Sequence, residues 1–493
     1  MIEKGPENFP ALFFWKTPMF QNTYTSLPQI LFTSASPETV AAPQMIAAND
    51  ALAKDLGLPA GWLQSPEALQ ALSGNAPLPD TAPIAMAYAG HQFGHWVPSL
   101  GDGRAILAGE ITAPGGQRYD LHLKGAGRTP YSRNGDGRAT LGAMLREYVV
   151  SEAMHALGIP TTRSLAVVAT GENVMREALL PGAVLTRVAK SHVRVGTFQY
   201  LSARSENAAM RALAAHEITR NFPGAPQGEE KYLWFLAQVI ARQAPLIARW
   251  MNVGFIHGVM NTDNMSVCGE TIDYGPCAFM DTFHPQKTFS SIDQFGRYAW
   301  DKQPVIALWN LTRLAEAMLP LFHEDREQAI TLAETQLQHF MPAFEHAFES
   351  GMSKKLGLLT PREGDTQFIT QTLQHMVDAG ADFTQFFSTL TEIASGERPA
   401  PPDNWFTLWQ ARIALDDGSA TMRLQTMRSA NPLYIPRNHR IEQAIQAANT
   451  GDLQPFHRLV QVVTNPHTPQ PGNDDYAAAP AIEEVVHQTF CGT

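Results

Sequence analysis

Residues 255–276 read FIHGVMNTDNMSVCGETIDYGP and carry the strongest local signal in the sequence, because they bring His257, Asn261, Asp263, Asn264 and Asp273 into one short segment. The segments MSVC and TIDY predict two short strands joined by a turn at Gly269 and Glu270. Such a hairpin brings Asn264 and Asp273 together, and an amide oxygen and a carboxylate are hard oxygen ligands suited to Mg²⁺. The alternative is a polar hairpin whose Asn and Asp side chains cap their own backbone.

Asp263 directly precedes the predicted metal ligand Asn264. A carboxylate at this place can accept the proton of an attacking hydroxyl or orient it. HGVMNTDN resembles a modified catalytic loop of protein kinases, and Asp273-Tyr274-Gly275 resembles their DFG motif. We therefore predict Asp263 as the base, and we expect His257 to orient the loop.

A glycine-containing loop, SLGDGRAIL (99–107), places Gly101, Gly103 and Arg104 at the start of a predicted strand. Glycine lets the backbone approach phosphate oxygens closely, and arginine adds a planar charged fork. By itself the motif is better explained by a tight turn than by a phosphate-binding loop. RAILAGEITA (104–113) and RYDLHLKGA (118–126) then predict two strands of a hairpin around PGGQ.

Lys124 ends the second of these strands, on the same face as His122. Its place after a glycine loop resembles that of the phosphate-pairing lysine of kinases. Glu147 lies within a helix predicted over residues 141–159, where it can hold Lys124 by an ion pair. Taken alone, Lys124 has the alternative of an ordinary exposed strand lysine, and Glu147 has that of a solvated glutamate on a helix face. The complete order of loop, lysine, helix glutamate, base and metal aspartate favours the kinase-like interpretation.

An arginine-rich insertion, GAGRTPYSRNGDGRATLG (125–142), separates the lysine strand from the helix, where an ordinary kinase has a short connection. It contains Asp136 and Gly137 among the arginines Arg128, Arg133 and Arg138. Arginines among glycines form a flexible basic surface suited to a polyanion.

The remaining pattern predicts an α+β fold with a strand-rich front and a helical back. Apolar residues recur at helical spacing over 38–58, and strands are predicted at 164–170 and 183–189. Helices are expected over 230–254 and through a long run at 304–349.

Composition excludes several classes of protein. The 493 residues carry 36 basic and 47 acidic side chains, a net charge of −11, which argues against broad nucleic-acid binding. Three cysteines (Cys268, Cys277 and Cys491) indicate a reducing compartment and not a disulfide framework. The N-terminal segment lacks the pattern of a secretory signal, and we see no apolar stretch near the ~20 residues of a membrane span. We expect a cytoplasmic protein without a membrane partner.

Several long strings resemble the selenoprotein O family. They include YAGHQFGHWVPSLGDGRA (88–105), DLHLKGAGRTPYSRNGDGRATLGAMLREYVVSEAMHALGIPTTRSL (120–165), HGVMNTDNMSV (257–267), IDYGPCAFMD (272–281), QFGRYAWDKQP (294–304), NPLYIPRNHRIEQAI (431–445) and the terminal CGT. The resemblance covers nearly the whole chain and is most specific between about 84 and 304.

The resemblance implies a two-lobed, protein-kinase-like fold with family-specific extensions. The implied units are an N-terminal extension packed on the N-lobe (1–83), the N-lobe (84–190), a helical C-lobe (191–475) and a tail ending in Cys-Gly-Thr (476–493). It also implies a protein adenylyltransferase that binds ATP in a flipped orientation, with Mg²⁺ or Mn²⁺. Such an enzyme transfers AMP to Ser, Thr or Tyr hydroxyls of proteins and releases pyrophosphate.

The same resemblance assigns roles to individual residues. Lys124, with Glu147 as its helix partner, and Asp263 as proton acceptor carry the chemistry, and Asn264 and Asp273 hold the metal. The implied nucleotide-binding residues are Gly101, Gly103, Arg104, Lys124, Asp136, Gly137, Arg187 and Arg194. Animal relatives carry selenocysteine at the place of Cys491, which implies a redox role that we expect to be regulatory.

Two other functions fit the same motifs. A UTP- and Mn²⁺-dependent protein uridylyltransferase needs the same residues, and a true phosphokinase differs only in which phosphorus is attacked. A nucleotide-binding pseudokinase scaffold is the alternative from another class, but a scaffold has no need of both base and metal ligands. We expect a monomer whose protein targets the sequence does not reveal.

Overall fold

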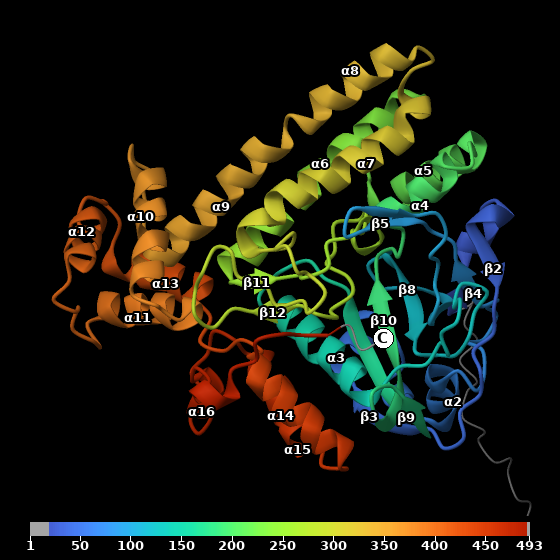
Figure 1. Cartoon of the computed structure of the whole chain (residues 1–493), viewed down its shortest axis with the longest axis horizontal. Helices are drawn as coiled ribbons and strands as arrows, with labels where there is room; N and C mark the ends of the chain where they lie inside the picture. Colours follow the sequence, from blue (N-terminus) through green and yellow to red (C-terminus); the bar gives the residue numbers. More distant parts are fainter. Residues whose placement is uncertain (1–18, 491–493) are drawn as a thin grey trace, which may run out of the picture.

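An antiparallel sheet of eight strands forms the front of the chain in the computed structural model, which describes residues 19–490. Its strand order is β2-β4-β7-β8-β10-β9-β3, with β1 paired to β7. Figure 1 labels β2, β4, β8, β10, β9 and β3 of this sheet. The strands are β1 (Phe20–Gln21), β2 (Phe32–Ser34), β3 (Gln44–Ala48), β4 (Ile84–Met86), β7 (Ala105–Thr112), β8 (Arg118–Lys124), β9 (Arg163–Met175) and β10 (Leu179–Ala189).

The predicted hairpin at the centre of this sheet is confirmed. β7 and β8 pair antiparallel from Ala105 opposite Lys124 to Thr112 opposite Arg118. Leu121 and Leu123 are buried in a core that also contains residues of the short helices α1 (Asp50–Asp55) and α2 (Pro66–Ser73). The alternation of β8 therefore directs His122 and Lys124 to the opposite face of the sheet.

The helix predicted over residues 38–58 is wrong for most of its length. Residues 44–48 form β3, which pairs with β9, and only Asp50–Asp55 is helical. Pro43 lacks the N–H that a helix interior needs, and pairing with β9 buries Ile46 and Ala47. Asn49 then caps the short helix, because its side chain accepts a hydrogen bond from the Leu52 amide.

α3 (Leu141–Ala156) forms the helix that the sequence predicted for residues 141–159. It packs across the face of the sheet on which Lys124 lies. On its other side pack α14 (Asn438–Asn449) and α15 (Gln454–Val463) (Figure 1). The approach is close, since a Cβ on Gly142 would lie 2.6 Å from the side chain of Ile445. The predicted strands at 164–170 and 183–189 fall within β9 and β10.

The back of the chain is helical, which confirms an α+β fold with a strand-rich front. α6 covers the helix expected at 230–254, whereas the run at 304–349 is divided among α7, α8 and α9. The helices are α4 (Val195–Ser202), α5 (Asn207–Asn221), α6 (Glu230–Asn252), α7 (Gln303–Phe322), α8 (Arg326–Leu337), α9 (Phe340–Leu356), α10 (Asp365–Asp378), α11 (Phe383–Ser395), α12 (Asn404–Ile413), α13 (Ala420–Ala430) and α16 (Asp474–Ala477).

One helical segment among the described residues is long and apolar enough to cross a membrane by length and composition. This segment, Trp300–Phe322, corrects the expectation that the chain has no such stretch. Half of its most apolar window is buried inside the protein, where α7 packs against α4, α6 and α8. A core helix with these neighbours passes the same test.

Candidate active site

The segment 255–276 folds differently from the hairpin predicted for it. Its strands are β11 (Phe255–Ile256) and β12 (Ala278–Phe279), which pair with each other outside the polar stretch. MSVC and TIDY do not pair: Ser266 bridges to Arg194 and Thr271 bridges to Thr161. The backbone groups of the segment thus find partners in neighbouring elements, and only the turn at Gly269, with φ of +82°, is as predicted.

The segment nevertheless delivers its polar side chains to one cavity, called the central cavity here. Its volume is about 170 Å³. It is lined by Tyr88, Asp102, Gly103, Arg104, Ala105, Lys124, Arg187, Arg194, Val259, Asp263, Asn264, Asp273, Gly275 and Pro276. Most of the predicted site residues therefore meet at one place, although they come from β8, β10, the N-terminus of α4 and the loop after β11.

Asp273 is the electrostatic centre of this cavity. Its carboxylate accepts hydrogen bonds from Lys124 Nζ (3.0 Å), Arg187 Nη1 (2.6 Å) and Arg194 Nη1 (3.0 Å). Burial by itself would raise the pKa of Asp273, but these three cations hold that pKa well below its usual range. Its φ of +65° is uncommon for a residue other than glycine and marks a conformation that the surrounding contacts enforce.

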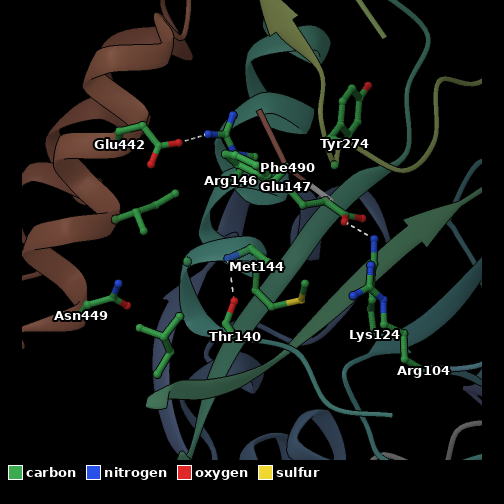
Figure 2. A pocket seen from close by; sticks show the side chains of 15 residues that line it. Arg104, Lys124, Thr140, Met144, Arg146, Glu147, Tyr274, Glu442, Asn449 and Phe490 are labelled. Atoms are coloured by element: carbon green, nitrogen blue, oxygen red, sulfur yellow. Dashed lines mark hydrogen bonds and ion pairs between the residues drawn. The ribbon is translucent and has the colours of Figure 1, made fainter. Parts of the chain in front are cut away.

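Glu147 holds Lys124 as predicted, with 2.5 Å between Glu147 Oε2 and Lys124 Nζ. Its other oxygen accepts a hydrogen bond from Arg187 at 3.3 Å. Arg146, the preceding residue on α3, instead pairs with Glu442 on α14 (Figure 2). Arg146 thus anchors α3 to the C-terminal helices, while the adjacent Glu147 contacts Lys124.

A second cavity, the flanking cavity, adjoins the first and shares Arg104, Lys124 and Gly275 with it. The C-terminal segment returns to this place and puts Phe490 in its wall (Figure 2). Thr489 anchors that segment, since its hydroxyl donates to the Pro276 carbonyl and its amide to the Phe289 carbonyl. The last described residues of the chain therefore border the candidate active site.

Asp263 has the environment of a general base. The residue is 7% exposed, and Asp263 Oδ2 accepts a hydrogen bond from Gln92 at 3.2 Å. Within residues 19–490, its other oxygen has no hydrogen-bond partner. Burial raises the pKa of Asp263 to about 6, although Gln92 and Arg194 oppose that rise. A carboxylate with a free oxygen and a pKa near neutrality is suited to accept a proton.

The hairpin of β5 (Gly90–Gln92) and β6 (His95–Val97) lies against the loop that carries Asp263. The amide of His91 donates to Thr262 Oγ1 at 2.7 Å, and the amide of Phe93 donates to Asn261 Oδ1 at 2.9 Å. A Cβ on Gly90 would lie 2.7 Å from Asp263 Oδ1, so only glycine permits this approach. His257 orients the loop as expected, through a 2.9 Å hydrogen bond between Nε2 and the Ile272 carbonyl.

Asn264 and Asp273 fit the ligand set of a hard divalent cation. Asn264 Nδ2 donates to the Val259 carbonyl at 3.0 Å, which leaves the amide oxygen as the ligating atom. The described part of the chain holds no group of three or more His, Cys, Asp or Glu side chains placed to bind a metal. Two protein ligands suit Mg²⁺ that takes its other ligands from phosphates and water.

The arginine-rich insertion covers the glycine loop. Gly101 has φ of +67°, and a Cβ there would collide with the ring of Tyr131. Asp136 binds Arg176 at 2.8 and 3.1 Å, and a Cβ on Gly137 would collide with the Gly127 carbonyl. The described residues that line the central cavity do not include Gly101, Asp136 or Gly137. Their nucleotide contacts stay predictions.

The cysteines divide between the buried interior and the chain end. Cys268 and Cys277 are buried and form no disulfide within the described residues, and burial raises the pKa of Cys268. Cys491, to which the sequence gave a redox role, lies outside the described residues.

Sequence reasoning missed three residues of the site. Tyr88 lies under the Arg194 guanidinium, with 4.5 Å between that group and the ring centre. Asp102 lines the central cavity from between the two loop glycines, and Gln92 contacts the base. Asp102 could have been found from the GDG motif, but nothing in the sequence connects Gln92 with Asp263.

Comparison with known proteins agrees with this geometry. The family model described as protein adenylyltransferase SelO matches residues 16–464. Relatives named protein nucleotidyltransferase YdiU include one from Nitrobacter hamburgensis, 52% identical over 485 residues that cover 96% of each chain. Those from Rhodopseudomonas palustris strain BisB5 and Bradyrhizobium sp. strain ORS 278 are each 54% identical and match 96% of this chain and 99% of their own. The chain belongs to the SelO family of protein nucleotidyltransferases.

Proposed function

We propose that this protein transfers AMP from ATP to Ser, Thr or Tyr hydroxyls of other proteins. The observation that carries the proposal is Asp263, whose buried, unpartnered oxygen shares one cavity with the metal-ligand pair and four cationic side chains. A base, a metal pair and phosphate-binding cations are the parts that a nucleotidyl transfer needs.

The residues divide the work as follows. Asp263 accepts the proton of the acceptor hydroxyl while the oxygen of that hydroxyl forms a bond to the α-phosphorus. The bond from that phosphorus to the oxygen bridging to the β-phosphate breaks, and pyrophosphate leaves with the bonding electrons. Arg104, Lys124, Arg187 and Arg194 stabilise the phosphate charge. Glu147 keeps Lys124 in place.

Asn264 and Asp273 would hold Mg²⁺ or Mn²⁺, which supplies charge neutralisation at the phosphates when bound. Lys124, Arg187 and Arg194 all contact the Asp273 carboxylate, which concentrates their positive charge beside the residues that would hold the metal. The kinase-like order of motifs around one cavity supports a kinase-like site, and the family's description as a protein adenylyltransferase supports AMP transfer. AMP transfer needs a nucleotide that presents its α-phosphorus to the acceptor, as the flipped orientation does.

The test uses ATP labelled at either the α- or the γ-phosphate, incubated with Mg²⁺, the protein and a cell extract. We expect label on protein from the α position only, and none with Asp273→Ala. Label from the γ position only would make the protein a phosphokinase and refute the proposal.

The remaining alternatives are further outcomes of this experiment. Stronger transfer from α-labelled UTP with Mn²⁺ would identify a uridylyltransferase. ATP binding without transfer of either label would identify a pseudokinase scaffold.

A further inference from the structure

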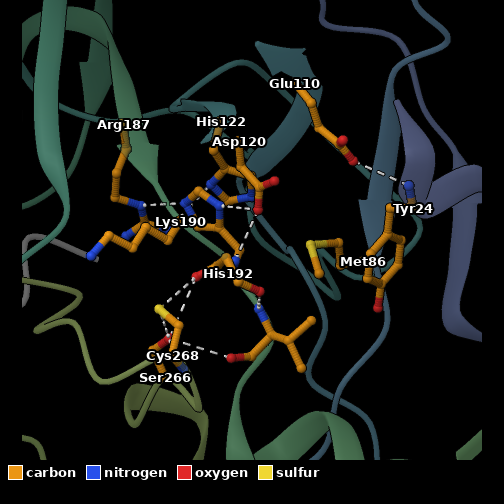
Figure 3. Close-up of polar contacts among 12 residues, drawn as sticks. Tyr24, Met86, Glu110, Asp120, His122, Arg187, Lys190, His192, Ser266 and Cys268 are labelled. Atoms are coloured by element: carbon orange, nitrogen blue, oxygen red, sulfur yellow. Dashed lines mark hydrogen bonds and ion pairs between the residues drawn. The ribbon is translucent and has the colours of Figure 1, made fainter. Parts of the chain in front are cut away.

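Arg187 belongs to a buried cluster of polar side chains, called the arginine clamp here. Figure 3 shows Arg187 beside His122, His192 and Asp120 of this cluster. Arg187 is 2% exposed, and its guanidinium uses each nitrogen differently. Nη1 donates to Asp273 and Glu147 at the cavity, at 2.6 and 3.3 Å. The other two nitrogens face away from the cavity toward two histidines. The clamp comprises Arg187, His122, His192, Asp102 and Asp120.

Each histidine links Arg187 to a buried carboxylate. Arg187 Nε donates to His192 Nε2 at 3.3 Å, and His192 Nδ1 lies 2.9 Å from Asp120 Oδ2. Arg187 Nη2 lies 3.1 Å from His122 Nδ1, and His122 Nε2 lies 3.0 Å from Asp102 Oδ2. The two imidazoles stack with 4.2 Å between ring centres.

These contacts fix the tautomer of both rings. A guanidinium only donates and a carboxylate only accepts, so each imidazole must accept from Arg187 and donate to its carboxylate. His122 is then the Nε2–H tautomer and His192 the Nδ1–H tautomer. Burial lowers the pKa of both histidines, that of His192 well below its usual value, which agrees with two neutral rings.

We propose that His122 and His192 are positioning residues that act through Arg187, a role that rests on the proposed contact of Arg187 with the nucleotide. Between them they hold two of the three guanidinium nitrogens, so that Nη1 alone points at Asp273 and the phosphate position. Without these acceptors the guanidinium can rotate about its side chain and lose that aim. A misplacement of about 1 Å in a catalytic group is enough to cost roughly 10²-fold in rate.

The asymmetry of the two tautomers provides a test. The amide of Asn lies at about the level of histidine Nδ1, and that of Gln at about the level of Nε2. His122→Asn and His192→Gln therefore keep an acceptor for Arg187. His122→Gln and His192→Asn keep only the donor to the carboxylate.

We expect the first pair to retain kcat for AMP transfer within about threefold and the second pair to lose about tenfold to a hundredfold, with a smaller change in KM. Asn is thus the better replacement for His122, and Gln is the better replacement for His192. A purely structural role predicts that the same amide is better at both, and that result would overturn the proposal. His439→Gln is the control: this histidine is 3% exposed, and its ring nitrogens have no hydrogen-bond partner among the described residues.

A double-mutant cycle tests whether the effect passes through Arg187. In an Arg187→Ala background, the difference between the two pairs should vanish. Persistence of that difference would show that the histidines act elsewhere. If wild-type protein transfers no label, the dissociation constant of ATP, measured by calorimetry, replaces kcat; the same crossover supports the clamp although the proposed function has failed.

A measurement on folded wild-type protein covers the case in which the variants do not fold. In ¹⁵N-histidine-labelled protein, the two imidazoles whose signals shift in Arg187→Lys should be one Nε2–H and one Nδ1–H tautomer. A protonated ring, or two rings of the same tautomer, would overturn the clamp.

Discussion

Asp263 combines burial with an incomplete set of hydrogen bonds. A buried carboxylate costs free energy unless partners compensate it, and here Gln92 compensates one oxygen only. The consequence is a pKa raised from 3.8 to about 6. The folded protein therefore binds a proton at this site more tightly than the unfolded chain, and the ionised base is present only above about pH 6.

Asp263→Asn separates activity from stability. In the wild type, AMP transfer should rise between pH 5 and 7 as Asp263 ionises. The contribution of Asp263 to the free energy of unfolding should fall over about pH 4 to 6, because the pKa of this carboxyl is higher in the folded protein than in the unfolded chain. At pH 8 the variant should transfer no AMP and unfold with a free energy higher by up to about 3 kcal/mol. Label transfer and urea unfolding measure both, with the exposed Asp417→Asn as control. A variant less stable than wild type at pH 8 would contradict this account.

At the scale of elements, α4 approaches the β5–β6 hairpin more closely than a side chain allows. The Ala89 amide donates to the Gly196 carbonyl at 3.0 Å, and a Cβ on Gly196 would lie 2.1 Å from the Ala89 oxygen. The same hairpin delivers Gln92 to the base. The glycine therefore decides how α4, the hairpin and the Asp263 loop fit together.

Gly196→Ala should push the hairpin away from this loop. We expect the free energy of unfolding to fall by about 1–3 kcal/mol and AMP transfer to be lost, because the added methyl group meets backbone atoms that cannot rotate away. Gly115→Ala in the β7–β8 turn is the matched control, since nothing lies within 4 Å of its added Cβ. Chemical denaturation and label transfer provide the readouts, and wild-type transfer by Gly196→Ala would refute the close fit.

Local signals explain which elements the sequence could predict. The β7–β8 hairpin and α3 follow from alternation, a Gly-Gly turn and a helical run that is capped by Thr140 and ended by Gly158, all of which act over short distances. The pairing of β3 with β9 and the bridges from Ser266 and Thr271 depend on partners far away in the chain. For the same reason the sequence could name Lys124, Asp263 and Asp273, and by resemblance Arg187 and Arg194, but not that Lys124 and the two arginines meet at the Asp273 carboxylate.

At the scale of the whole molecule, Arg437 joins segments that are remote in sequence. It directly precedes α14, is 1% exposed, and binds Asp281 at 2.5 Å and Asp382 at 2.8 Å. Asp281 lies shortly after β12, at the end of the segment that carries Asp273, while Asp382 caps α11. Arg437 Nε also donates to the Ala477 carbonyl at 3.2 Å. One guanidinium thus ties the site segment, the helical back and the C-terminal helices together.

Arg437→Ala should destabilise the whole fold, not the site alone. Two largely buried carboxylates, with side chains 17% and 10% exposed, then lose their guanidinium partner. Removing one partner of a fully buried ion pair costs about 3–5 kcal/mol because the remaining charge is uncompensated, and this cost is the upper bound here because both carboxylates keep some contact with solvent. Protonation relieves that charge, so the deficit against wild type should be smaller at pH 5 than at pH 8. Adding Asp281→Asn and Asp382→Asn should recover part of the lost stability, whereas the exposed Arg458→Ala should change it little. A deficit equal at both pH values, measured by urea unfolding, would mean that Arg437 acts through packing of its side chain and not through its charge.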